Sequence, residues 1–310
     1  PQEAAAILTD KALMKEAFLK GGVSASTGMR VYSLAEARGA AERIGYPVVV
    51  KRVDSSGSRG ITVVEQPEKL DEAYYYASER TTKDYVLVEG FIRGTEIGVD
   101  GFVQDGQLVF LAPHTKFVDH GKNTTIPVGH AFPYHCTQEV YEEIGRQMQA
   151  AVTAAGADQC SVNADVFVDG NKVSIIEMGG RTGATCIPEL ISIYYGFDFY
   201  EKMLRSALGE PVEFNCTGSQ PCMAKLLLSP VEGKITSIDK EGIRTLEEQG
   251  VTVSLDFPVG HNVFAMADGT DRIGHIIACT EEESQLDAWM MQVYRCICVD
   301  GETLEDIWKR

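Results

Sequence analysis

The sequence predicts an α+β protein, and three observations support this prediction. Helical patterns with capping residues at their starts alternate with short apolar strands in the first third of the chain. Two Asp-Gly turns further on join β-rich runs into hairpins. From about Cys222 the pattern changes to short strands and turns, which indicates a separate C-terminal module. At 310 residues the chain has the length of two or three domains.

The first third of the chain is expected to alternate helices and strands. A helix is predicted over Lys11–Lys20, because Thr9 and Asp10 suit its start and Gly21-Gly22 ends it. The run Ser-Leu-Ala-Glu from Ser33 is a capping box, and the helix that it opens runs to about Ile44. The other elements expected here are strands over residues 47–51, 61–64 and 85–89, a Gly/Ser-rich loop over 54–60 and a helix over 68–77.

Two hairpins with a common plan are predicted in the middle of the chain. Residues 96–103 and 108–112 flank Asp105-Gly106, and residues 163–168 and 172–177 flank Asp169-Gly170. An Asp-Gly turn between β-rich runs is a strong short-range hairpin signal. Residues 117–129 are polar and rich in Gly, Thr and Asn, which predicts a mobile loop. Further helices are expected over residues 138–155, 199–208 and, as a single late helix, 281–291.

Composition excludes several classes of partner. Asp and Glu total 45 against 28 Lys and Arg, a net charge of −17, which argues against nucleic acid and anionic membranes as partners. A local basic pocket for a small phosphate ligand is compatible with that charge. No stretch approaches the ~18 apolar residues of a membrane span, and the N-terminus lacks a basic signal-peptide region. The 8 cysteines form no C-x-x-C pair, so we expect free thiols in a cytoplasmic protein.

Two pieces of sequence suggest a nucleotide site. Lys51 ends a buried strand and precedes a loop whose small residues leave backbone N–H groups free to fold over phosphate oxygens. The alternative is a surface lysine before a flexible turn. Glu89 ends another strand, and the following backbone groups could pair with the edge of an adenine. The alternative there is a strand with one polar end residue.

Two further pieces suggest a metal and an anion. Asp165 and Glu177 lie twelve residues apart on the two arms of one hairpin, which brings their carboxylates together. Hard oxygen ligands without His or Cys suit Mg²⁺, although two solvated carboxylates are an equal alternative. Arg181 follows in a Gly-rich run, where a guanidinium can clamp phosphate or carboxylate, or can be a surface side chain. Asn163 shares the strand face of Asp165 and could reach the metal or an acyl group.

In this order, the four pieces resemble the ATP-grasp superfamily of carboxylate–amine and carboxylate–thiol ligases, from about Thr9 to Gly209. Asp10-Lys11 and the run from Gly45 to Lys51 match the two nucleotide lysines of the family. The run from Val88 to Ile92 matches the adenine hinge, and Gly94-Thr95-Glu96 matches the ribose glutamate. Asp165 and Glu177 match the metal carboxylates, and Arg181 matches the reactive-centre arginine.

The resemblance implies an ATP-grasp fold, in which two α+β subdomains clasp ATP, followed by a small β-rich C-terminal module. The implied division is a linker and helix over residues 1–30, a small lid subdomain over 31–95, a large subdomain with the metal site over 96–210, and the module over 211–310. Members of the family normally carry a small α/β domain ahead of the first nucleotide lysine. Because Lys11 comes so early, we expect that this chain is truncated or processed.

The resemblance also assigns roles. Lys11 and Lys51 would hold the ATP phosphates, Asp165 and Glu177 would hold Mg²⁺ or Mn²⁺, and Arg181, together with Lys51, would be catalytic and steady the phosphorylated intermediate. The remaining nucleotide contacts implied are Ser56, Gly57, Ser58 and Gly60 over the phosphates, the Gly90 carbonyl, Phe91 and the Ile92 N–H at adenine, Glu89 in the adenine pocket and Glu96 at the ribose. Many members have Asn where this chain has Gly179, which leaves the number of metal ions open.

The run from Glu177 through Thr182-Gly183 looks most like the L-amino acid ligases, which form dipeptides. The resemblance therefore implies an ATP-dependent ligase that activates a carboxylate as an acylphosphate and joins it to an amine. Its partners would be small molecules, in the first place amino acids, and a homodimer is compatible with the sequence. Two alternatives stay open: an enzyme of the carboxylase, carbamoyl-phosphate or purine-pathway type, and a nucleotide-binding module without catalysis.

Overall fold

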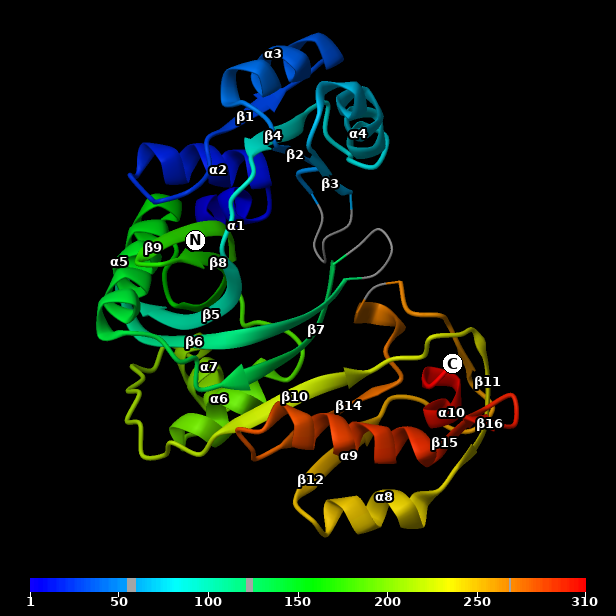
Figure 1. Cartoon of the computed structure of the whole chain (residues 1–310). Coiled ribbons are helices and arrows are strands. Elements are labelled where there is room, and N and C mark those ends of the chain that lie inside the picture. The colour runs from blue at the N-terminus through cyan, green and yellow to red at the C-terminus, as the bar shows by residue number, and fades with distance from the viewer. Residues whose placement is uncertain (55–59, 121–124, 268) are drawn as a thin grey trace. The chain divides into compact units, whose positions relative to one another are not determined.

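The computed structural model describes residues 1–54, 60–120, 125–267 and 269–310 (Figure 1). The chain divides into two compact units. The first comprises Pro1–Pro113, His135–Thr182 and Tyr200–Phe214, and the second comprises His114–Tyr134, Gly183–Phe199 and Asn215–Arg310. The subdomain boundaries expected from the sequence stay predictions.

A small antiparallel sheet in the first unit carries the predicted nucleotide strands. Its order is β1-β4-β2-β3, with bounds Gly28–Val31, Val86–Gly90, Val48–Lys51 and Ile61–Val64. All residues of β2 are buried, as its apolar run predicts, and β2 lies between β4 and β3 in the sheet. Helices α3 (Leu34–Ile44) and α4 (Leu70–Ser78), the latter preceded by the short η1 (Pro67–Lys69), pack on this sheet around a core that contains Ala40, Val50 and Val88.

Helix α2 (Lys11–Lys20) begins where the sequence predicts. The side chain of its N-cap, Asp10, accepts hydrogen bonds from the Ala12 and Leu13 N–H groups. The helix contacts β1 and β4 of the small sheet, and it also contacts β9 and α5. It therefore connects the nucleotide strands to the hairpin of the carboxylates. A further helix, α1 (Gln2–Leu8), precedes it and was not predicted.

Both predicted hairpins form. Strands β5 (Thr95–Gln104) and β6 (Gln107–His120) turn at Asp105-Gly106, whose φ angles of 52° and 72° are those of a type I′ turn. Strands β8 (Cys160–Asp169) and β9 (Lys172–Gly179) make the second hairpin. In the first unit these strands follow the order β6-β5-β8-β9, and α5 (Gln138–Ala155) packs against β9. Helix α7 (Phe199–Ala207) follows later in the chain.

The second unit is richer in helices than the sequence suggests. Strands β12 (Val251–Leu255), β14 (Gly274–Ala278), β10 (Cys222–Leu227) and β7 (Thr125–Phe132) lie in that order, and a smaller sheet has the order β13-β11-β15-β16, with bounds Asn262–Val263, Gly233–Ile238, Ile297–Val299 and Glu302–Thr303. Its helices are α6 (Ile187–Tyr195), α8 (Lys240–Glu247), α9 (Glu283–Arg295) and α10 (Leu304–Trp308), with a short η2 (Gly269–Asp271). Of α8, α9 and α10, the sequence predicted only α9. Helices α8 and α10 are too short to show a clear helical periodicity of hydrophobic residues.

The prediction of a loop over residues 117–129 is wrong for the part that the structure describes. Strand β6 continues to His120 and β7 starts at Thr125, with Phe117 opposite Gly129. The glycine belongs to a strand because two backbones meet there: a Cβ at Gly129 would lie 2.3 Å from the Ala224 carbonyl oxygen. Residues 121–124 lie outside the described residues.

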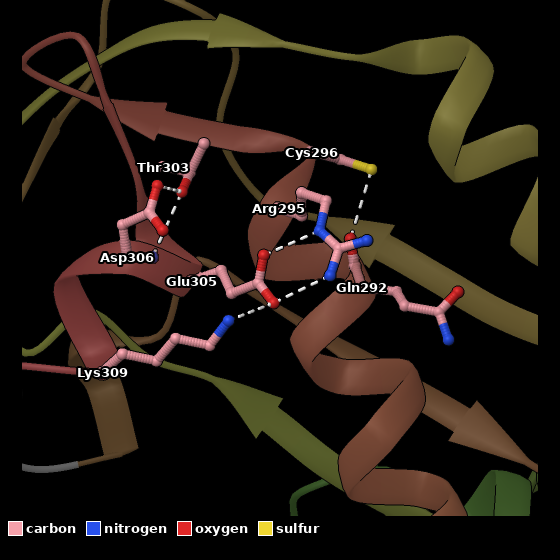
Figure 2. A network of polar contacts seen from close by, with 7 residues as sticks. All are labelled: Gln292, Arg295, Cys296, Thr303, Glu305, Asp306 and Lys309. Carbon is pink, nitrogen blue, oxygen red and sulfur yellow. Dashed lines mark hydrogen bonds and ion pairs between the residues drawn. The ribbon is translucent and has the colours of Figure 1, made fainter.

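Figure 2 shows the polar contacts that join α9 to α10. The Glu305 carboxylate accepts hydrogen bonds from Arg295 Nε and Nη2, at 2.7 and 2.9 Å, and from Lys309 Nζ at 2.8 Å. These hydrogen bonds lower the pKa of Glu305 to about 2, and the hydrogen bond from Arg295 has the largest effect. The Thr303 side chain caps α10 through the Asp306 N–H. Two helices that are weak by themselves are thus fixed to each other.

Two predictions about the chain as a whole are confirmed within the described residues. All the cysteines are free thiols, as expected from their scattered positions. None of the helices in the described part of the chain has the length and apolar character needed to cross a membrane.

Candidate functional site

The two predicted metal carboxylates are neighbours. Asp165 of β8 and Glu177 of β9 are cross-strand partners, next to a bulge between Asp165 and Val166. The bulge inserts Ile176 as an extra residue on β9, between the partners of Asp165 and Val166, and breaks the regular alternation there. The hairpin signal in the sequence therefore gave the correct pairing. The charge of Glu177 is compensated by Lys11: Lys11 Nζ lies 2.8 Å from Glu177 Oε2, and the Lys11 side chain is 12% exposed.

Lys11 is held in place by the start of α2. Its backbone N–H donates to the Val53 carbonyl at 3.0 Å. The preceding residue, Asp10, is buried, and it accepts a hydrogen bond from the Tyr85 hydroxyl at 2.5 Å in addition to its capping bonds. Burial and the bond to Asp10 raise the pKa of Tyr85 to about 12, so this hydroxyl stays a donor. The Lys11 side chain thus extends to the carboxylate pair from a helix terminus that is held in place.

Lys51 takes part in a second, deeper set of ionic contacts. Its ammonium pairs with Glu89 of β4, which also pairs with Lys15 of α2 at 2.9 Å. Ser26 Oγ accepts a hydrogen bond from Lys15 Nζ at 2.9 Å and donates to Glu89 Oε2 at 3.1 Å. The side chains of Lys15, Glu89 and Lys51 are 2%, 3% and 8% exposed.

The electrostatics of this buried group follow from its charges. Burial by itself would raise the pKa of Glu89, but the ammoniums of Lys51 and Lys15 hold it at about 2. Burial lowers the pKa of Lys15, and Glu89 opposes that shift only in part. For Lys51 burial acts in the same direction, but the attraction of Glu89 outweighs it and the pKa is raised. Glu89 is thus an anion paired with two cations. Together, Lys15, Lys51 and Glu89 have a net charge of +1.

Lys15 and Ser26 were missed by the sequence analysis. A signal existed for Lys15, since it lies four residues after Lys11 and so on the same face of the helix. No comparable local signal points to Ser26, which reaches Glu89 from a position 63 residues away in the chain.

The predicted adenine hinge lies beside a pocket. The Gly90 N–H donates to the Thr27 carbonyl and the Phe91 N–H to the Pro47 carbonyl, at 2.9 and 3.2 Å, which fixes this backbone. The pocket has a volume of about 160 Å³ and is lined by Phe91, Ile92, Arg93, Phe167, Asp169, Lys172 and Ser174. That is small against the ~300–1,000 Å³ of most ligand sites, so it suits a planar base rather than a whole nucleotide. Glu96 is the cross-strand partner of the lining residue Phe167.

The arginine predicted for the reactive centre lies at the surface. Arg181 is exposed, and its Nη1 donates to the Thr182 carbonyl at 2.8 Å. Behind it lies Asp100 of β5, which is fully buried and accepts from Asn163 Nδ2 at 2.7 Å and from Thr182 Oγ1 at 3.4 Å. Asp100, which the sequence analysis did not single out, thereby ties the arginine segment to the strand beside the carboxylates.

Part of the predicted phosphate loop is described. Gly60 closes it, because the Gly60 carbonyl accepts from the Arg52 N–H at 3.0 Å just after β2. Its φ of +72° is one that glycine adopts without strain. Ser56, Gly57 and Ser58 lie outside the described residues, so their predicted contact with phosphate stays a prediction.

Comparison with known proteins identifies this arrangement. The family model described as an ATP-grasp domain matches residues 44–189, which include Lys51, Glu89 and both carboxylates. The fold matches as well: the structure of an L-amino acid ligase from Bacillus licheniformis has a TM-score of 0.77 at 18% identity, over 98% of this chain and 74% of that one. The chain contains a match to the ATP-grasp domain and has the ATP-grasp fold. Its predicted fold class is thereby confirmed.

Curated ATP-grasp relatives carry several different activities. The D-alanine–D-alanine ligase of Trichlorobacter lovleyi is 28% identical over 206 residues, which are 63% of this chain and 64% of that protein. The formate-dependent phosphoribosylglycinamide formyltransferase of Synechococcus sp. CC9902 is 30% identical over 234 residues, 71% of this chain and 55% of that protein. The chain thus spans between half and two thirds of these two relatives. Because the printed activities of these relatives differ, they do not select one reaction or substrate for this chain.

The donor set fits the Mg²⁺ with which the ATP-grasp family binds its nucleotide. Asp165 and Glu177 offer hard carboxylate oxygens side by side, and Mg²⁺ usually takes one or two carboxylates together with water and substrate phosphates. The described residues contain no cluster of three or more His, Cys, Asp or Glu side chains suited to a metal. Asn163 lies opposite Gly179, and its Nδ2 is held by Asp100. The two carboxylates therefore suit an ion shared with a phosphate ligand.

Proposed function

We propose that the chain is an ATP-dependent carboxylate–amine ligase and that an amino acid supplies the amine. One observation carries the proposal: Lys11, a predicted phosphate ligand, contacts Glu177, a predicted metal ligand, at 2.8 Å. A cation for phosphate and an anion for Mg²⁺ in direct contact suit a ligand with both charges, namely a magnesium nucleotide. With that ligand bound, Glu177 would hold Mg²⁺ in place of the ammonium, and Lys11 would turn to a phosphate oxygen.

In the first step an oxygen of the substrate carboxylate attacks the γ-phosphorus of ATP. The bond between that phosphorus and the bridging oxygen breaks, and ADP leaves with the electron pair. Lys11 and Lys51 hold the phosphates and neutralise the charge that moves onto ADP, while Asp165 and Glu177 hold the metal. When bound, Mg²⁺ polarises the phosphate oxygens and adds positive charge there. Phosphoryl transfer needs positioning and charge more than a protein nucleophile, which matches the residue types at this site.

In the second step the amine nitrogen attacks the acyl carbon, phosphate leaves with its electron pair, and the nitrogen gives up a proton. Arg181 is exposed, so its guanidinium can turn from the Thr182 carbonyl to the acylphosphate and the departing phosphate. The phosphate loop that ends at Gly60 would exclude water, which otherwise hydrolyses the acylphosphate. The pocket beside Phe91 and Ile92 would take the adenine ring.

The test is phosphate release from ATP with a panel of acceptors. Single amino acids, pairs of amino acids, bicarbonate, formate and a ribonucleotide amine are each offered with MgATP. The proposal expects release that requires two amino acids and a new amide in the mass spectrum. Release that needs bicarbonate, formate or a ribonucleotide amine would instead assign the chain to the carboxylase or purine-pathway type. Tight MgATP binding without phosphate release under any condition would indicate that the chain is a nucleotide-binding module without catalysis.

A further inference from the structure

Two lysines share one buried carboxylate in the first unit. Lys15 lies 2.9 Å from Glu89, and Lys51 pairs with the other oxygen of the same group. Ser26 bridges Lys15 and Glu89. One lysine would suffice to neutralise Glu89, so the second ammonium needs its own explanation.

The proposed reaction supplies a reason. To bind a nucleotide phosphate, Lys51 has to direct N–H donors away from Glu89, and an ammonium has only three of them. A buried carboxylate that loses its counter-charge is strongly destabilising. With Lys51 as its single partner, Glu89 would therefore hold the lysine back from the ligand.

We propose that Lys15 is a positioning residue, which keeps Glu89 paired so that Lys51 can pass from that carboxylate to a nucleotide phosphate. Lys15 itself stays with Glu89 and Ser26 and does not touch the ligand. This inference rests on the ATP site of the proposed function. It adds a residue to that site which the matching motifs do not contain.

Packing around Lys15 supports a fixed position. Its side chain is 2% exposed, and its stem passes Gly28, the first residue of β1. A Cβ at Gly28 would lie 2.8 Å from Lys15 Cγ, so the strand leaves room for the stem by having no side chain there. Lys11, one turn earlier on α2, goes to Glu177 instead. The same helix thus directs one lysine to each of the two acidic groups.

The test compares Lys15→Met and Lys15→Arg with the control Lys20→Met, which makes the same change at an exposed position of the same helix. The dissociation constant of MgATP is measured by calorimetry, and KM and kcat by phosphate release. Lys15→Met is expected to raise the dissociation constant and the KM for ATP roughly 10- to 100-fold, because Glu89 then retains Lys51. At saturating ATP, kcat should change little. Lys15→Arg keeps the charge and should recover most of the affinity, and Lys20→Met should match the wild type.

A double-mutant cycle separates this role from a merely structural one. In a Glu89→Gln background there is no anion to hold Lys51 back, so adding Lys15→Met should change the MgATP dissociation constant less than about threefold. If Lys15→Met reduced MgATP affinity equally in the wild-type and Glu89→Gln backgrounds, the proposal would be overturned. It would also be overturned if Lys15→Met kept wild-type MgATP affinity and only lowered the melting temperature. Should Lys15→Met not fold, the comparison of Glu89→Gln with the double variant still decides.

The outcomes also distinguish this inference from the proposed function. A wild-type chain that binds MgATP but releases no phosphate contradicts the ligase proposal, while the binding constants of the variants still test Lys15. A wild-type chain that ligates normally and a Lys15→Met variant with an unchanged KM for ATP contradict the inference about Lys15 alone.

Discussion

At the residue scale, the surroundings of a charged side chain decide what it can do. Lys15, Lys51 and Glu89 are buried and mutually compensated, so each depends on the others. Arg181 is exposed and donates a hydrogen bond to the carbonyl of the next residue. A buried ion pair is costly to break, whereas an exposed arginine can change partner at little cost. Arg181 therefore suits contact with a transient group, and the buried set suits a permanent site.

Arg181→Ala should strongly reduce turnover and leave ATP binding nearly intact. The guanidinium is proposed to stabilise charge that develops on the departing phosphate, so its loss should lower kcat on the order of 10²- to 10³-fold, as for other transition-state donors. The measurement is phosphate release with the substrates found in the panel, together with calorimetry of MgATP. Arg146→Ala, which removes an exposed arginine paired with Glu143 on α5, is the matched control. An Arg181→Ala variant with full turnover would contradict the proposed mechanism.

At the element scale, α2 organises the site. Asp10 caps the helix, Lys11 extends to Glu177, and Lys15 extends to Glu89. The helix also contacts both the small sheet and β9. A shift of its first turn would therefore disturb the nucleotide lysines and the carboxylate pair together.

Asp10→Ala should lower both stability and ATP affinity. The change removes two capping hydrogen bonds and the acceptor of the Tyr85 hydroxyl, at a cost of about 1–2 kcal/mol for the cap alone. Thermal unfolding and MgATP calorimetry measure the two effects. Asp239→Ala is the control, because Asp239 caps α8 in the second unit through the Glu241 and Gly242 N–H groups. Equal losses of ATP affinity in both variants would contradict the role given to α2.

The contacts between α9 and α10 make a prediction about acid stability. The pKa of Glu305 is about 2 in the folded chain, against ~4.3 for an ordinary glutamate. Its contribution to stability is therefore fully present above about pH 4.3 and is lost as the pH falls towards 2. Glu305→Gln should lower the melting temperature at neutral pH, and this difference should shrink across that window.

The control for that experiment is Glu241→Gln, which removes an exposed ion pair with Arg244 on α8. Exposed pairs contribute little, so this change should have a small effect at every pH. A Glu305→Gln difference that persists unchanged at pH 2 would show that the carboxylate charge is not what joins the two helices.

At the scale of the whole molecule, a chain with a net charge of −17 has cations around its candidate ligand site. Lys11, Lys15, Lys51 and the two metal carboxylates all belong to the first unit. The site therefore does not need the overall charge of the protein to favour anions. There Lys11, Lys15 and Lys51 balance the charges of Glu89, Asp165 and Glu177, so the added charge of a bound metal ion would favour an anionic ligand.

MgATP should raise the melting temperature, and removal of the metal should reduce this effect. A ligand at 100 times its dissociation constant adds about 2.7 kcal/mol to stability. With EDTA present, ATP alone should stabilise the protein less, because four phosphate charges then face the carboxylate pair without a metal. In Asp165→Asn the increment due to Mg²⁺ should be lost, which scanning calorimetry with and without the metal measures. An unchanged Mg²⁺ increment in that variant would place the metal elsewhere.

The sequence alone determined the local parts of this protein. An Asp-Gly turn and alternating strands fix the pairing of Asp165 with Glu177, a cap and a glycine pair define α2, and an apolar run places Lys51 at the end of a buried strand. Each of these follows from residues within about twenty positions of one another. Turn geometry, capping and periodicity act at that range, so they can be predicted from the sequence.

Only the tertiary structure decided which charges meet. Lys15 reaches Glu89 across 74 positions of the chain, and Asn163 reaches Asp100 across 63. Gly129 lies in a strand, although its sequence neighbourhood is typical of a loop, because a Cβ at this position would lie 2.3 Å from the Ala224 carbonyl oxygen of the next strand. Such contacts depend on how elements pack rather than on local pattern. For this reason the sequence predicted the fold class and the pairing of Asp165 with Glu177, whereas the contact of Lys15 with Glu89 became visible only in the fold.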